Sequence, residues 1–86
     1  MNARPKLARR ARLRWDERDQ RHMIVYPERG LALNASAAEV VKLCDGTRSI
    51  DDIVAALASA TGEPRERIDR DVRELLARLE EKRLVE

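Results

Sequence analysis

The segment that most limits how this chain can fold is residues 22–34, HMIVYPERGLALN. A run of residues with high β-propensity, His22 to Tyr26, is followed by a turn signal and by a second short apolar run, Leu31 to Leu33. This order predicts a β-hairpin. Because the chain holds little other strand sequence, the resulting sheet must keep a free edge, and an unpaired edge can bind another chain through its N–H and C=O groups. The central question about function is therefore what pairs with that edge.

One further strand precedes the hairpin. Residues 12–15, RLRW, alternate in polarity, so Leu13 and Trp15 lie on one face and the two arginines on the other, as in a half-buried strand. The run from His22 to Tyr26 is apolar on both faces, which predicts that it is the central strand. Residues 27–30, PERG, are typical of a type I turn that is closed by a glycine with positive φ.

Helical periodicity begins after the hairpin. In NASAAEVVKLCDG, Ser36 and Glu39 have capping-box spacing, and the helix is expected to end at Asp45–Gly46. Four apolar residues form the stripe of this helix: Val40, Val41, Leu43 and Cys44.

Two more helices follow the same rules. Ser49 and Asp52 repeat the start signal, Ile53, Val54 and Leu57 share one face, and Gly62 ends the second helix. Pro64 opens the third helix at a position where a missing N–H is tolerated. The apolar stripe of this third helix consists of Ile68, Val72, Leu75, Leu76 and Leu79.

The sequence therefore predicts an α+β protein of order βββααα, with a three-stranded antiparallel sheet packed on three helices. With 86 residues and two aromatic side chains, one small domain is expected, and we assign it to residues 11–86. Residues 1–10 belong to a basic N-terminus that we expect to be flexible; a nucleic-acid-binding arm would also need such charges. We assign no site to this segment.

Composition argues against several classes of function. A single cysteine, Cys44, excludes an internal disulfide and a cysteine-rich metal site, and no apolar run is long enough to span a membrane. We expect a cytoplasmic protein without a cofactor. Catalysis is not expected either, because His22, the only histidine, has no nucleophile at motif spacing and Cys44 lies in an apolar stripe at a helix end.

The same order of elements also occurs in winged helix-turn-helix regulators, so DNA binding is the alternative function. A DNA-binding helix needs an excess of positive charge to neutralise phosphates. Residues 63–83 instead hold seven basic and seven acidic residues. This balance argues against a nucleic-acid partner.

Several short motifs closely resemble those of the PqqD family. RLRWDERDQRHMIVYPERGLALN is followed by LCDGTRSIDDIV, and the resemblance covers about residues 8–85. RWDE, YPERG, LN before the first helix and LCDG at its end stand in the order and spacing of that family. One departure is Arg18–Asp19, where we expect a small or apolar residue followed by Arg, so this connection carries no functional assignment.

The resemblance implies a non-catalytic peptide chaperone of pyrroloquinoline quinone (PQQ) biosynthesis. Such proteins hold the precursor peptide PqqA and present it to the radical SAM enzyme PqqE, which joins a Glu to a Tyr of the peptide. The resemblance further implies a winged-helix-like fold in which the peptide lies as an added strand, in a groove between the third strand and the third helix.

The residues here suggest where such a peptide binds. We expect the edge to be formed by Gly30, Leu31, Ala32, Leu33 and Asn34. On the third helix, Leu76 falls to one side of the core stripe, so we expect it to be an apolar floor with Asp69 and Arg73 as a polar rim. The alternative, that Leu76 widens the core stripe while the two charges are solvated, stays open. We expect a monomer with bound peptide and, in its absence, a homodimer or an exchanged arm through the free edge.

Overall fold

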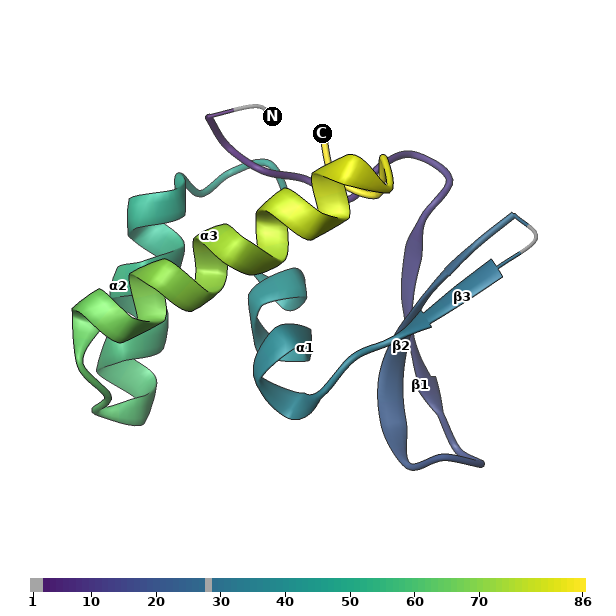
Figure 1. Ribbon diagram of the computed structural model, residues 1–86, viewed down its shortest axis with the longest axis horizontal. Coiled ribbons are helices and arrows are strands. Elements are labelled where there is room, and N and C mark those ends of the chain that lie inside the picture. The colour runs from purple at the N-terminus through teal and green to yellow at the C-terminus, as the bar shows by residue number, and fades with distance from the viewer. Residues whose placement is uncertain (1–2, 28) are drawn as a thin grey trace.

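Figure 1 shows the computed structural model, which describes residues 3–27 and 29–86. Three strands come first, β1 (Arg12–Asp16), β2 (Arg21–Tyr26) and β3 (Arg29–Ala32). Three helices follow, α1 (Ala35–Lys42), α2 (Ile50–Thr61) and α3 (Arg65–Glu81). The strands form an antiparallel sheet in the order β1-β2-β3. The predicted α+β fold of order βββααα is confirmed.

One face of the sheet carries a row of apolar side chains that packs on the core. Leu13, Ile24 and Leu31 form one row across the three strands, and the side chain of Ile24 is completely buried. Helix α1 contacts β2 on one side and both α2 and α3 on the other, so it forms the middle layer between the sheet and the helix pair (Figure 1). As predicted, β2 is the central strand.

Gly30 has a different role from the one predicted. It belongs to β3 and is not among the residues with positive φ, so the predicted glycine kink is wrong. The predicted turn includes Glu28, which lies outside the described residues. A Cβ atom at Gly30 would collide with Cε of Met23 on the neighbouring strand. This Cε atom is the end of a flexible side chain, so a larger residue at position 30 would require only a shift of the Met23 methyl group.

The start of α1 is also shifted from the prediction. Asn34 is the N-cap, because its Oδ1 accepts a hydrogen bond from the N–H of Ala37 at 2.7 Å. The predicted capping box of Ser36 and Glu39 is therefore wrong, since Ser36 is already inside the helix. Asparagine is as good an N-cap as serine, and here it is the residue that directly follows the strand.

The α1–α2 connection is organised by Asp45. The hydroxyl of Thr47 donates to its Oδ1 at 2.6 Å, the N–H of Thr47 donates to the same oxygen, and Arg48 lies 3.0 Å from Oδ2. The Thr47 hydroxyl is the main reason why the pKa of Asp45 is lowered. Helix α2 then begins with the predicted capping box of Ser49 and Asp52.

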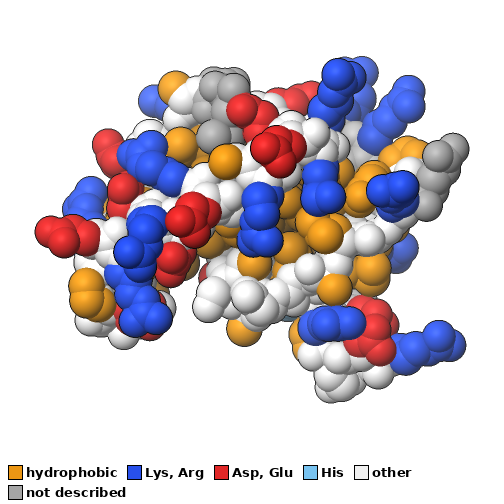
Figure 2. Space-filling view, in the orientation of Figure 1, with side chains coloured by type: hydrophobic (Ala, Val, Ile, Leu, Met, Phe, Trp, Pro, Cys, Tyr) orange, Lys and Arg blue, Asp and Glu red, His pale blue; other side chains and the backbone are white. Residues whose placement is uncertain are grey.

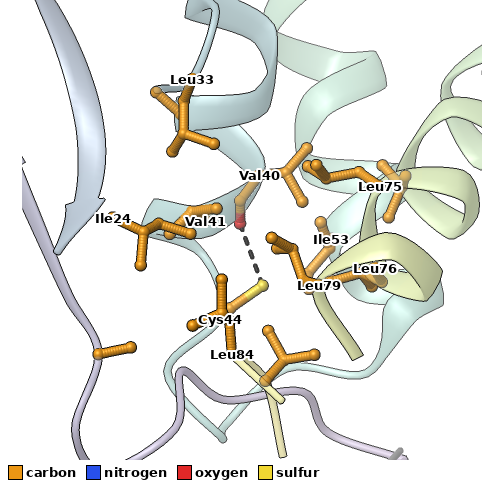
Figure 3. Close-up of a cluster of buried hydrophobic side chains, with 14 of the residues drawn as sticks. Ile24, Leu33, Val40, Val41, Cys44, Ile53, Leu75, Leu76, Leu79 and Leu84 are labelled. Atoms are coloured by element: carbon orange, nitrogen blue, oxygen red, sulfur yellow. Dashed lines mark hydrogen bonds between the residues drawn. The ribbon is translucent and has the colours of Figure 1, made fainter. Parts of the chain in front are cut away.

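Helix α3 supplies the largest part of the core. All five residues of its predicted stripe are buried, and they pack against side chains of the sheet, α1 and α2 (Figure 3). The end of α2 is set by Gly62, which has a φ of 72° and bonds back to Ala58. This sharp end lets Pro64 start α3, and α3 then packs directly on α2.

The basic segment before β1 is paired with the rest of the protein on two sides. The N–H of Lys6 donates to the C=O of Glu86, and that of Glu86 donates to the C=O of Lys6 at 2.7 Å. On the other side, the N–H of Gly46 donates to the C=O of Pro5, whose side chain is buried. Whereas the sequence suggests a flexible terminus, residues 5–8 lie between the α1–α2 connection and the end of the chain.

Candidate functional site

Strand β3 lies at the edge of the sheet, with a strand neighbour on one side only in the described part of the chain. The N–H of Leu33 donates to the C=O of His22 at 3.0 Å, which makes these two residues a hydrogen-bonded pair. Backbone groups of an antiparallel pair alternate in direction, so the N–H and C=O groups of Ala32 and Gly30 point away from β2. Both residues are exposed, and their backbone groups are available to a further strand.

A groove begins where β3 ends and runs between α1 and α3. Its volume is about 760 Å³. We call it the α1–α3 groove; its lining comprises Asn34, Ser36, Ala37 and Val40 on one side and Asp71, Glu74, Leu75, Ala77 and Arg78 on the other. Figure 2 shows hydrophobic side chains at the bottom of this hollow, with charged side chains above them. An apolar floor with a charged rim beside an open strand edge suits an extended peptide.

The groove continues towards α2 as a smaller hollow of about 220 Å³. The two spaces share Ser36, Val40 and Asp71, and the second is lined mainly by apolar side chains such as Leu57 and Ile68. The two hollows therefore adjoin at the first turns of α1 and α3.

The residues predicted for the strand edge lie together at this site. Gly30, Leu31 and Ala32 are in β3, Leu33 follows directly, and Asn34 both caps α1 and lines the groove. Leu33 is buried and Leu31 is half-buried, so their side chains anchor the edge while its backbone remains accessible.

The predicted rim on α3 faces α2 instead. Nε of Arg73 lies 3.0 Å from Oδ1 of Asp69, and its guanidinium also lies 3.4 Å from Oδ1 of Asp51 in α2. These ion pairs hold Arg73 and Asp69 on the α2 side of α3, and neither residue lines the α1–α3 groove.

The prediction that Leu76 forms an apolar floor is wrong, because the exposed fraction of this side chain is 0%. Leu76 packs into the core beside Ile53 of α2 and Leu79 (Figure 3). For Leu76 the alternative that the sequence left open, a wider core stripe, is correct, whereas the two charges that it expected to be solvated are ion-paired. The physical reason is that α2 covers the side of α3 to which Leu76 points.

Sequence reasoning missed the groove residues on the opposite flank of α3. Asp71, Glu74 and Arg78 are separated by three and four residues, so they form a line along the helix on the other side of the buried stripe. This spacing is visible in the sequence. What the sequence lacks is the information that distinguishes the two flanks, since only the packing of α3 against α2 decides which flank stays open.

The thiol of Cys44 and the ring of His22, the two side chains considered above for catalysis, each contact neighbouring groups of the protein. Sγ of Cys44 donates to the C=O of Val40, and burial, with a smaller effect of the Asp45 charge, raises the pKa of the thiol to about 11. The ring of His22 packs edge-on against Trp15, with ring centroids 5.0 Å apart. Within residues 3–27 and 29–86, no three potential metal ligands lie close together, and no helix is both long and apolar enough to cross a membrane.

Comparison with known proteins is consistent with this arrangement. The family model for coenzyme PQQ synthesis protein D (PqqD) matches residues 21–85. The chain belongs to the PqqD family. Among its PqqD-family relatives is the PqqA binding protein of Rhodopseudomonas palustris strain TIE-1, which is 45% identical over 80 residues, or 93% of this chain and 78% of the relative.

Solved structures agree with this assignment to the PqqD family. The PqqD part of Methylobacterium extorquens PqqCD, described as a stand-alone recognition element for ribosomally synthesised, modified peptides, matches with a TM-score of 0.83 and 35% identity. That match covers 95% of this chain and 87% of the other. TbiB1 in complex with the TbiA(beta) leader peptide has the same fold, with a TM-score of 0.80 at 19% identity and coverage of 94% of each chain.

Proposed function

We propose that this protein is a peptide chaperone of PQQ biosynthesis, which binds the precursor peptide PqqA as an additional strand on β3. Membership of the PqqD family supports the peptide partner, since the relative from R. palustris is named a PqqA binding protein. The open edge of β3 beside the α1–α3 groove is the observation that carries the proposed mode of binding.

In this mode of binding, different groups of the protein contribute affinity and specificity. The outward N–H and C=O groups of Gly30 and Ala32 bond to the backbone of any extended peptide, so they contribute affinity that depends little on sequence. Side chains of the peptide that point towards α3 meet Leu75 and the line of Glu74 and Arg78, and these contacts select the sequence. The protein itself needs no catalytic group for this task.

The proposed role continues with delivery of the bound peptide to the radical SAM enzyme PqqE, in the cytoplasm where ribosomal precursors are made. A strand added at an edge keeps its far edge and one row of side chains exposed, so an enzyme can reach a peptide that is already extended. In the absence of peptide, the same edge can pair with a second copy of the protein. We therefore propose that peptide binding favours the monomer over such a homodimer or exchanged arm.

A matched pair of variants tests the position of the peptide. Arg73 and Arg78 are both exposed arginines of α3, but only Arg78 lines the α1–α3 groove. Isothermal titration with synthetic PqqA should show weaker binding for Arg78→Glu than for the parent, and nearly unchanged binding for Arg73→Glu. Reversal of a charge at the rim of an interface changes affinity by about 1 kcal/mol, or roughly fivefold.

Two outcomes would contradict the proposal. Absence of PqqA binding by the unchanged protein would refute the function. Loss of affinity in Arg73→Glu and not in Arg78→Glu would keep the function but move the peptide to the α2 side of α3. Circular dichroism of both variants shows whether the fold is retained.

A further inference from the structure

Two basic turns lie side by side at one end of the molecule. The first turn holds Arg9 and Arg10 and is closed by a hydrogen bond from the N–H of Ala11 to the C=O of Ala8. Ala8 in turn donates to the C=O of Leu84 at 2.8 Å, directly after the second turn, which holds Lys82 and Arg83. This backbone contact places four exposed cations on neighbouring turns.

The start of the sheet adds two more cations. Arg12 is opposite Val25, which is opposite Gly30, so Arg12 lies at the same end of the sheet as the first residue of β3, Arg29. Figure 2 shows cationic side chains gathered at this end. We call this surface the basic end and define it by Arg9, Arg10, Arg12, Arg29, Lys82 and Arg83.

The cations of the basic end differ in their pairing from five other arginines and lysines of the protein. Arg21, Lys42, Arg48, Arg70 and Arg73 each lie within 4 Å of a carboxylate. None of the six residues of the basic end has such a partner among the described residues. Even with Glu80 and Glu81 of the adjacent helical turn, Glu86 beside Lys6, and Glu28 next to Arg29 in the sequence counted, six positive charges against four negative charges leave an excess of two. This end therefore attracts anionic groups.

Arg83 occupies a backbone position that normally favours glycine. Its φ is 58°, and it ends α3 in a Schellman motif, in which Leu84 donates to Leu79 and Arg83 donates to Glu80. Glycine adopts this conformation without the steric conflict that a Cβ atom causes. A cation near a helix C-terminus interacts favourably with the helix dipole, but this effect does not extend to Arg9, Arg10, Arg12 and Arg29. The charge of Arg83 is thus present despite an unfavourable backbone conformation.

The basic end is continuous with the proposed peptide site. Lys82 follows Arg78 by four residues, so it extends the line of groove residues along α3. Arg29 begins the strand on which the peptide is proposed to pair. A peptide antiparallel to β3, the orientation of the other strand pairs here, leaves the strand at Arg29 with its C-terminal flank.

We propose that the basic end binds acidic side chains in the C-terminal flank of the bound precursor peptide. This inference rests on the proposed function and adds a second contact to it, which fixes the direction of the peptide along β3. Long-range attraction between these charges would also steer the peptide towards the groove before strand pairing.

The test uses variants that separate charge from fold. In Arg83→Gly the strained position receives its preferred residue, so we expect an unchanged or higher melting temperature together with weaker peptide binding. A triple variant also carries Arg9→Gln and Arg10→Gln. Arg65→Gln, at the opposite end of α3, is the control. We expect about a threefold loss of affinity for the single variant and about tenfold for the triple variant at low salt, with both losses shrinking at about 0.5 M salt.

The peptide provides the second arm of the experiment. In a synthetic PqqA in which every Asp and Glu of the C-terminal flank is replaced by its amide, binding to the parent protein should weaken and the difference between parent and triple variant should disappear; a flank without Asp or Glu would itself overturn the inference. Equal affinities of parent and triple variant for unmodified PqqA would overturn this inference while leaving the proposed function intact. If the triple variant lost only its interaction with PqqE, the basic end would belong to the enzyme interface and this inference would be wrong. No binding of PqqA to the parent would refute both proposals.

Discussion

Substitution of Ala32 by proline isolates the backbone of β3 as a binding surface. Ala32 is exposed, and its N–H points away from β2, so proline removes no hydrogen bond of the sheet. Edge strands tolerate proline when its nitrogen faces solvent. We expect the free energy of unfolding to change by about 1 kcal/mol or less, owing to the restricted φ of proline.

The expected effect on peptide binding is larger. One backbone hydrogen bond contributes about 0.5–1.5 kcal/mol, and a peptide C=O left without its donor adds about 1–3 kcal/mol when it is buried. Together these terms predict a loss of about 1.5–4.5 kcal/mol, or roughly 10- to 2,000-fold in the dissociation constant. Because the lost bond joins uncharged groups, the loss should persist at high salt, unlike that of the arginine variants.

Isothermal titration with PqqA measures the loss, and denaturation followed by the fluorescence of Trp15 reports the stability. Trp15 is the only tryptophan of the chain and is 50% exposed, so its emission is sensitive to unfolding. Ala32→Val is the matched control, because it changes the same side chain but keeps the N–H. An affinity of Ala32→Pro equal to that of Ala32→Val would show that no peptide strand pairs at Ala32.

Two further predictions concern the core and the thiol. Leu76→Ala should lower the free energy of unfolding by about 2–5 kcal/mol, because Leu76 is completely buried. Arg73→Ala should change it by about 0.5 kcal/mol, because the side chain of Arg73 is exposed. Similar losses for the two variants in urea titrations would contradict the placement of Leu76 in the core. Cys44 has a pKa of about 11 in the folded protein against 9.0 for a free thiol, so the unfolded chain releases this proton first and stability should fall by up to about 3 kcal/mol between pH 9 and pH 11. Cys44→Ala should lose about 1 kcal/mol of packing at neutral pH but lack this part of the alkaline decline, and parallel pH dependences of the two proteins would refute the assignment.

Local sequence was sufficient to predict the elements of this fold and their order. Alternation in RLRW and the run from His22 to Tyr26 identify strands because side chains of a strand alternate between two faces. The capping box of Ser49 and Asp52 and the glycine at 62 mark helix ends through bonds between residues close in sequence. These features depend on neighbours within about four residues, so the sequence contains them directly.

The open edge of the site could also be predicted from the sequence, because three strands in consecutive order leave β3 with one neighbour. The flank of α3 that lines the α1–α3 groove could not be predicted from the sequence. Both flanks of the α3 stripe carry charges at helical spacing, and the sequence favours neither Asp69 and Arg73 nor Glu74 and Arg78. Tertiary packing decides between them: α2 covers one flank and buries Leu76, while the other flank faces Asn34 across the groove. The pairing of residues 5–8 with the α1–α2 connection and with residues 84–86 was likewise decided by contacts between segments far apart in the chain, which no local pattern encodes.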